Sequence, residues 1–205
     1  MEPNRSHIEG KDNFGNCAIH YAVKHQNFEC LKRLVDAGAD VNRLGPNGKT
    51  PLHISSGLNN VEITKFLIER GAKTTSKDKY GRSALIFAVM NGSLQCASIL
   101  LAHGAPFDQP DRSNNHPLHY ACAYGYIEII DLLMEAGCDP NLTNDWGLNA
   151  TTIGVLKNYF DCTRKMLEYS KTDIDGVDQD GRSLLSNTLN SITEENYENF
   201  IFFLE

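Results

Sequence analysis

The sequence predicts an all-α repeat solenoid, built from helix-turn-helix units that are joined by β-hairpin-like loops. Two series of residues, nearly all glycine, recur with a period of 33 residues, except for a last interval of 34 in the first series. The first series is Gly15, Gly48 and Gly81, continued by Asn114, Gly147 and Gly181, and the second is Gly38, Gly71, Gly104 and Gly137. A unit of this length cannot bury its own apolar face, so neighbouring units have to stack into a continuous core.

A four-residue motif follows each glycine of the first series and fixes the family resemblance. Its copies are Cys17-Ala18-Ile19-His20, Thr50-Pro51-Leu52-His53, Ser83-Ala84-Leu85-Ile86, His116-Pro117-Leu118-His119 and Asn149-Ala150-Thr151-Thr152. The units resemble ankyrin repeats, whose hallmark is T-P-L-H-x-A at a 33-residue period. The resemblance implies a short lead, 1–11, and one ankyrin repeat domain, 12–205. Its six repeats are 12–44, 45–77, 78–110, 111–143, 144–177 and 178–205.

The second repeat shows why each element forms. Thr50 is suited to cap a first helix, and Pro51 occupies the first helical position, where a missing N–H costs nothing. Asn59 ends that helix, as Gly92 does in the next repeat, because both types tolerate the left-handed conformation. The second helix is predicted over Val61–Arg70, with Gly71 as its C-cap.

The hairpin loop and the ends of the array complete the prediction. The loop is expected over 72–80, with a positive φ at Gly81 and at Asn114, the most tolerable substitute for glycine. Arg33 stands where later repeats have Phe66, Ile99 and Leu132, which predicts a solvent-facing N-terminal cap. The fifth repeat has one inserted residue near Lys171. The sixth has a longer inter-helix segment, 191–196, and ends without its glycine, so we expect a divergent cap or a natural chain that continues.

Composition excludes several classes of function. The 205 residues carry 19 Lys and Arg against 26 Asp and Glu, a net charge of -7, which disfavours nucleic acids and anionic membranes. No apolar run reaches the length of a membrane span, and the polar N-terminus does not resemble a secretion signal. We therefore expect a monomeric protein of the cytoplasm or nucleus, with six free thiols and no cofactor or small-molecule substrate.

Three motifs that resemble chemical sites have simpler explanations. The segment 45–50, Gly-Pro-Asn-Gly-Lys-Thr, lacks the spacing of a phosphate-binding loop. His116, His119 and Cys122 are zinc-type ligands, but the resemblance assigns His119 to bridging neighbouring hairpins, and a fourth ligand is missing. Cys30, Cys96 and Cys162 share one slot of the second helix and are interpreted as small buried hydrophobes rather than redox sensors. We expect no metal site and no catalysis.

The resemblance places partner binding on a concave face of hairpin tips and first helices. The slots of this face hold seven basic residues and two acidic ones, a local charge of +5: Lys24, Lys49, Lys79, Arg82, Arg112, Lys157 and Arg182 against Asp145 and Asp180. Large apolar residues also occupy it, although the repeat core does not require them: Phe14, Leu58, Tyr80, Met90, Tyr124 and Trp146. Solvated surface charge and local bracing of hairpins are the simpler alternatives.

We hypothesise that the chain is a non-catalytic protein-binding module for an acidic or phosphorylated segment with apolar anchors. Tyr80, Tyr124 and Trp146 supply the anchors, since such residues dominate interface hot spots. Lys79, Arg82 and Arg112 pair with carboxylates or phosphates. The complete predicted site is Lys49, Lys79, Tyr80, Arg82, Met90, Arg112, Tyr124 and Trp146.

Other functions remain open at this stage. The array could be the N-terminal regulatory or targeting part of a larger enzyme or channel, or a reader of basic, histone-like tails. Nucleic-acid stacking on the basic tips is a weaker alternative. Leu34 and the following Asp40-Val41-Asn42 resemble the ankyrin sites of asparaginyl hydroxylases, so Asn42 is a candidate for hydroxylation, besides its structural role in the hairpin.

Overall fold

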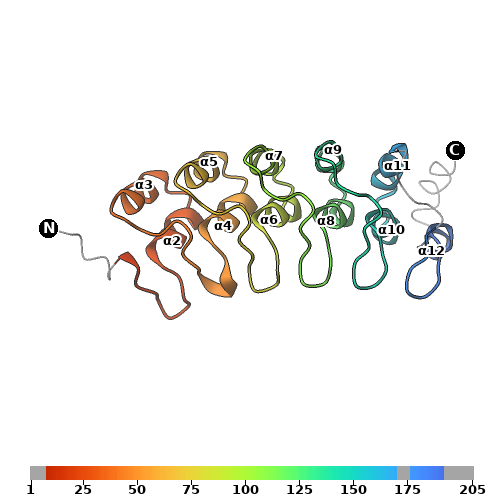
Figure 1. Cartoon of the computed structure of the whole chain (residues 1–205), viewed down its shortest axis with the longest axis horizontal. Helices are drawn as coiled ribbons and strands as arrows, with labels where there is room; N and C mark the ends of the chain where they lie inside the picture. The colour runs from red at the N-terminus through yellow and green to blue at the C-terminus, as the bar shows by residue number, and fades with distance from the viewer. Residues whose placement is uncertain (1–7, 170–175, 192–205) are drawn as a thin grey trace. The chain divides into compact units, whose positions relative to one another are not determined.

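The computed structural model describes residues 8–169 and 176–191. The chain forms two compact units, Met1–Pro106 and Phe107–Glu205, which we call the N-terminal and C-terminal units. Each is built from stacked helix pairs with hairpin loops at one edge (Figure 1). The all-α repeat solenoid predicted from the sequence is confirmed. Extended backbone pairs only at isolated bridges in the described residues, between Lys77 and Ser83 and between Val177 and Ser183.

The N-terminal unit contains three helix pairs. The first helices pack side by side in chain order, and each also packs on the second helix of its own pair (Figure 1). The first helices are α2 (Ala18–Lys24), α4 (Pro51–Gly57) and α6 (Ala84–Met90), and the second are α3 (Phe28–Asp36), α5 (Val61–Glu69) and α7 (Leu94–Ala102). A short 3₁₀ turn, η1 (Pro46–Gly48), forms one hairpin tip. Leu31, Leu52, Leu67, Leu85 and Leu100 are fully buried between these layers.

The C-terminal unit repeats the same arrangement. Its first helices are α8 (Pro117–Tyr124), α10 (Ala150–Leu156) and α12 (Leu184–Ser191), and its second helices are α9 (Ile127–Glu135) and α11 (Phe160–Glu168). Ile130, Leu133 and Met166 are fully buried in its core. Despite its divergent motif, the fifth repeat keeps the register, because Asn149 caps α10 by accepting a hydrogen bond from the Thr152 N–H at 2.9 Å. The insertion near Lys171 and the segment 192–205 lie outside the described residues.

Helix ends follow the predicted chemistry. The Thr50 hydroxyl accepts from the His53 N–H, Pro51 is the first residue of α4, and α5 ends one residue before the predicted Arg70. Asn59 and Asn114 both adopt a positive φ, of 51° and 60°, as their slots require. Arg33 is exposed and paired with Glu29 within α3, which agrees with an N-terminal cap. None of the helices in the described segments is long and apolar enough to cross a membrane.

Candidate functional site

A carboxylate or amide at the start of each well-formed hairpin holds the tip. The Asp78 Oδ1 accepts hydrogen bonds from the N–H groups of Tyr80 and Arg82, both at 2.9 Å. The same pattern, two and four residues ahead, is made by Asp12, Asp111, Asn144 and Asp178. These side chains mimic a backbone turn and so fix where the tip residues point. These carboxylates and amides are not among the predicted site residues, although they recur with the period of the repeat.

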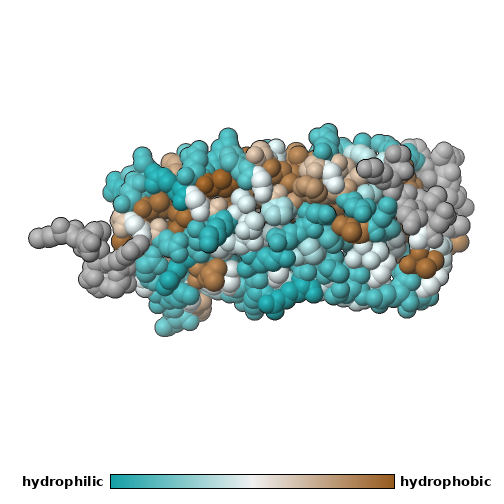
Figure 2. Space-filling view, viewed as in Figure 1, coloured by the Kyte–Doolittle hydropathy of each residue, from teal (hydrophilic) through white to brown (hydrophobic). Residues whose placement is uncertain are grey.

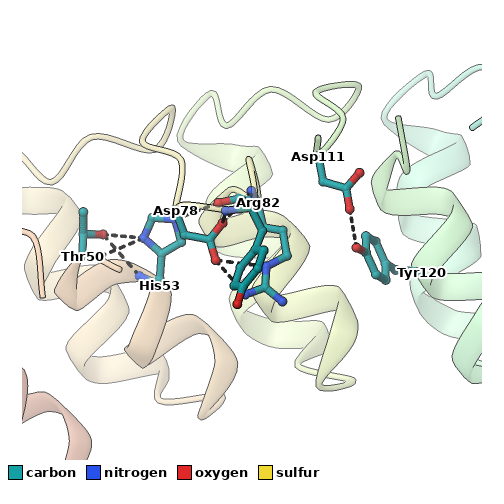
Figure 3. A network of polar contacts seen from close by, with 7 residues as sticks. Thr50, His53, Asp78, Arg82, Asp111 and Tyr120 are labelled. Carbon is teal, nitrogen blue, oxygen red and sulfur yellow. Dashed lines mark hydrogen bonds and ion pairs between the residues drawn. The ribbon is translucent and has the colours of Figure 1, made fainter. Parts of the chain in front are cut away.

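The second oxygen of this carboxylate is bound differently in different repeats. Tyr21 donates its hydroxyl to Asp12 at 2.5 Å, and Tyr120 donates to Asp111 at 2.6 Å (Figure 3). In the third repeat the tyrosine position is Phe87, which has no hydroxyl. There the Asp78 Oδ2 accepts instead from the Arg82 Nε at 3.0 Å and Nη2 at 2.7 Å (Figure 3).

The Asp78–Arg82 pair is buried within the N-terminal unit. The Asp78 side chain is 0% exposed and the Arg82 side chain only 18%. Burial alone raises the pKa of Asp78, but the hydrogen bonds from the Arg82 side chain and from the backbone outweigh it, so the pKa lies below its usual value. Arg82 lies in the predicted slot. However, two of its N–H groups already donate to one carboxylate oxygen, the Asp78 Oδ2, and the charge count of +5 left this carboxylate out.

Around this pair, cations and aromatic rings alternate in what we call the cation–aromatic cluster: Lys49, Lys79, Tyr80, Arg82 and Phe87. The Arg82 Cζ lies 4.7 Å from the ring centroid of Tyr80 and 4.8 Å from that of Phe87. The Lys79 Nζ lies 4.8 Å from the Tyr80 centroid and the Lys49 Nζ 4.9 Å from the Phe87 centroid. Such stacking holds each cation over a ring face. The structure therefore brings four of the predicted residues together and adds Phe87.

A groove runs beside the cluster between the C-terminal halves of α4 and α6. It is lined by Lys49, His53, Ile54, Gly57, Leu58, Phe87 and Asn91. Leu58 is exposed although it is large and apolar. Met90, the last residue of α6, is half-buried next to Asn91. The N-terminal unit thus combines an apolar groove with a basic rim.

The C-terminal unit holds the other predicted residues. Trp146 is 55% exposed at its hairpin tip and lines a groove with Leu148, Leu156, Asp178, Gln179, Asp180, Arg182 and Asn187. Tyr124, at the end of α8, is 44% exposed and stacks on Tyr126 with ring centroids 6.1 Å apart. Arg112 is exposed at the preceding tip. Figure 2 shows exposed apolar areas as separate patches among hydrophilic residues on the visible face of each unit.

The repeat histidine is a structural residue in both units. The His53 Nδ1 accepts from the Thr50 N–H at 3.1 Å, while its Nε2–H donates to the Arg82 carbonyl at 3.0 Å (Figure 3). His119 makes the equivalent bonds to the His116 N–H and the Leu148 carbonyl, whereas the Nε2–H of His20 donates to the Arg43 carbonyl, which lies earlier in its hairpin. Both ring nitrogens of His119 are therefore occupied by backbone groups of adjacent hairpins, as the sequence predicts. Burial lowers the pKa of His119 to about 4.

The remaining sequence candidates also have defined surroundings. Asn42 donates its Nδ2–H to the Gly71 carbonyl at 3.0 Å and accepts at Oδ1 from the Lys73 N–H at 2.8 Å. Its hydroxylation stays a prediction. Cys96 and Cys162 are buried, and burial raises the pKa of both thiols, that of Cys162 to about 11. The interpretation as a buried hydrophobe is wrong for Cys30, which is exposed.

Comparison with protein families agrees with this architecture. The model described as ankyrin repeats (3 copies) matches residues 3–78 and 73–144, more than half of the chain. The chain belongs to the ankyrin repeat family. Ankyrin repeats are generally non-catalytic modules of protein–protein interaction, and membership of the family implies that the chain is a protein-interaction module.

Curated relatives match over single stretches of ankyrin sequence. A BTB/POZ domain and ankyrin repeat-containing protein, NH5.2 of Oryza sativa subsp. japonica, is 50% identical over 50 residues, which cover 23% of this chain and 10% of that protein. Protein phosphatase 1 regulatory subunit 27 is 49% identical over 41 residues in both Mus musculus and Homo sapiens, covering 20% of this chain and 27% of theirs. The chain thus spans a minor part of these relatives.

Proposed function

We propose that this ankyrin array binds a partner protein on its hairpin tips and first-helix ends, and that the recognised segment is acidic or phosphorylated with apolar anchors. The observation that carries the proposal is the cation–aromatic cluster. It stacks three cations on two rings, while its hairpin supplies a single carboxylate, that of Asp78. A surface with such an excess of positive charge favours an acidic partner over a basic tail.

Exposed aromatic residues support the apolar half of the proposal. Tyr80 is 48% exposed, and Tyr124 and Trp146 are similarly exposed in the C-terminal unit. Trp and Tyr dominate the energetics of interfaces, because they bury large areas while losing little side-chain entropy. Their exposure at tips and helix ends, rather than burial between repeats, leaves this area available to a partner.

The same proposal includes the cellular location and the kind of role. Six free thiols support a reducing compartment, the cytoplasm or the nucleus. A relative named as a regulatory subunit of a protein phosphatase supports a role in which the repeats hold another protein. We propose this role without any chemical step on the array itself.

Site-specific photo-crosslinking tests which surface binds. Benzoylphenylalanine replaces Tyr80, Trp146 or Lys65 in turn, and each protein is irradiated in cells. Lys65 is the control, because it is exposed on α5 in the second-helix layer of the N-terminal unit. We expect benzoylphenylalanine at position 80 or 146 to form a crosslinked adduct of one discrete mass. Benzoylphenylalanine at position 65 should form none. Adducts from position 65 alone would place the partner on the second helices and refute the proposal.

A further inference from the structure

Neither of the two lysines of the cation–aromatic cluster, Lys49 and Lys79, has an acidic partner among the described residues. Arg82 is neutralised by Asp78 at 2.7 Å. Neither Lys49 nor Lys79 has a carboxylate oxygen within 4.0 Å of its amine in the part of the chain that the structure describes. Each amine instead lies over a ring face, of Phe87 and Tyr80 respectively. The cluster therefore presents two held positive charges, one on each side of the Arg82 guanidinium.

The groove next to Lys49 has room for one large side chain. Its volume is about 220 Å³, and Ile54, Leu58 and Phe87 supply apolar walls. Gly57 allows α4 to approach α6, since a Cβ at this position would lie only 3.3 Å from the Asn91 Nδ2. Asn91 is fixed there, because its Nδ2–H donates to the Phe87 carbonyl at 2.8 Å. The apolar walls of this groove thus lie directly beside the Lys49 amine.

We propose that this groove binds a short, unphosphorylated acidic segment of the partner protein. A large apolar residue of the segment occupies the space between Leu58 and Phe87. One Asp or Glu pairs with Lys49 at the edge of the groove, and another pairs with Lys79. The inference rests on the proposed function and narrows it to one subsite and one class of peptide.

Two observations favour carboxylates over a phosphorylated residue. Phosphate recognition typically relies on the bidentate fork of an arginine, and the Nε and Nη2 of Arg82 both already donate to the Asp78 Oδ2. The two unpaired cations are lysines, which act as point charges and suit single carboxylates. Ring stacking holds both amines in place before the ligand arrives, which reduces the entropy lost on binding.

The test starts with a displayed library of random dodecapeptides selected against the full chain. We expect enriched peptides in which Asp or Glu lies within a few residues of Phe, Leu, Ile, Trp or Met. Binding of a selected peptide is then measured by fluorescence anisotropy. Lys49→Glu should weaken it about tenfold, because an attraction is replaced by a repulsion. Lys65→Glu is the matched control, with the same change of charge on the second-helix layer, and should alter the affinity less than about twofold.

A second pair of variants tests the groove independently of charge. Leu58→Ala removes an exposed wall of the groove and should weaken binding about tenfold. Leu167→Ala, on α11 in the second-helix layer, removes a similarly exposed leucine in the C-terminal unit and should leave the affinity unchanged. Thermal unfolding of each variant shows that folding is retained.

The possible results separate this inference from the proposed function. If Leu156→Ala or Trp146→Ala abolishes binding while Lys49→Glu and Leu58→Ala do not, the tips still bind the peptide, but this subsite is wrong. Tenfold tighter binding of a peptide with phosphoserine in place of glutamate would also overturn the inference, as would a selection without acidic–apolar peptides.

Discussion

At the scale of single residues, the third hairpin differs from the first and the fourth because Phe87 replaces their tyrosine. Tyr21 and Tyr120 each donate a hydroxyl to the hairpin aspartate nine residues before them, but Phe87 cannot. Arg82 makes the missing bond to Asp78 and stacks on the Phe87 ring. The absence of a hydroxyl at Phe87 thus explains why the Arg82 guanidinium bonds Asp78. The sequence alone assigns this guanidinium to a carboxylate or phosphate of the partner.

Removing this guanidinium should destabilise the N-terminal unit. Arg82→Ala leaves the fully buried Asp78 carboxylate with one unbonded oxygen, at a cost of about 2–3 kcal/mol in the free energy of unfolding. Adding Phe87→Tyr should restore about 1 kcal/mol, because the new hydroxyl can bond the Asp78 Oδ2 as Tyr120 bonds Asp111. Urea denaturation followed by circular dichroism measures both changes. A double variant no more stable than Arg82→Ala would contradict the assignment.

The predicted residue positions were more reliable than the predicted residue partners. The 33-residue period placed Lys49, Lys79 and Tyr80 correctly near one another, because equivalent slots of successive repeats are neighbours in space. It could not pair Arg82 with Asp78, since that contact depends on which residue fills position 87. The same limit applies to Cys30, which is exposed although Cys96 and Cys162, in the same slot of later repeats, are buried.

At the scale of the helices, a left-handed glycine ends α8, a first helix, and another follows the end of α9, a second helix. Gly125 has a φ of 77°, and a Cβ on it would lie 2.7 Å from two ring carbons of Tyr159. Gly137, in the same unit, has a φ of 96° but only a distant contact, 3.9 Å from Phe107. Both glycines therefore have a positive φ, but only at Gly125 would an added Cβ collide with a neighbouring side chain.

This difference predicts the outcome of two alanine substitutions. Gly137→Ala should cost about 1 kcal/mol, since alanine is strained in the left-handed region. Gly125→Ala should cost at least about 1 kcal/mol more, because the Tyr159 ring also has to move. Trp146 is the only tryptophan and lies in this unit, so its fluorescence during urea denaturation reports both values. Equal losses would show that the ring moves away at no cost.

Helix boundaries were predictable because they are set by local chemistry. The Thr50–Pro51 start of α4 and the Gly71 stop after α5 both follow from the residues themselves. The hairpin aspartates also recur in the sequence, but the pattern of apolar residues does not indicate their role. They are recognised only when the hydrogen bonds of the tip are traced to their acceptors.

At the scale of the whole molecule, buried neutral histidines make stability depend on pH. Burial lowers the pKa of His20 and His53 in the N-terminal unit, and that of His119 to about 4 in the C-terminal unit. An unfolded histidine titrates near pH 6.5, so the unfolded chain binds more protons between pH 6.5 and 4. The stabilisation by these residues is fully present above pH 6.5 and falls with pH through that window. Lowered aspartate pKa values, such as that of Asp78, act in a separate range below about pH 4.

The contribution of His119 can be isolated with one variant. Between pH 7.5 and pH 5, its shift predicts a loss of about 2 kcal/mol in the stability of the C-terminal unit. His119→Gln should be less stable at pH 7.5, because the bonds to His116 and Leu148 are lost, but should lose about 2 kcal/mol less than the wild type on acidification. Leu118→Ala serves as the control, since it weakens core packing next to His119 without removing a titrating group and should keep the wild-type pH dependence. Urea denaturation followed by Trp146 fluorescence at each pH provides the comparison. If His119→Gln retains the full dependence, the acid sensitivity of this unit arises elsewhere, and the imidazole bridge contributes the same stability whether or not it is protonated.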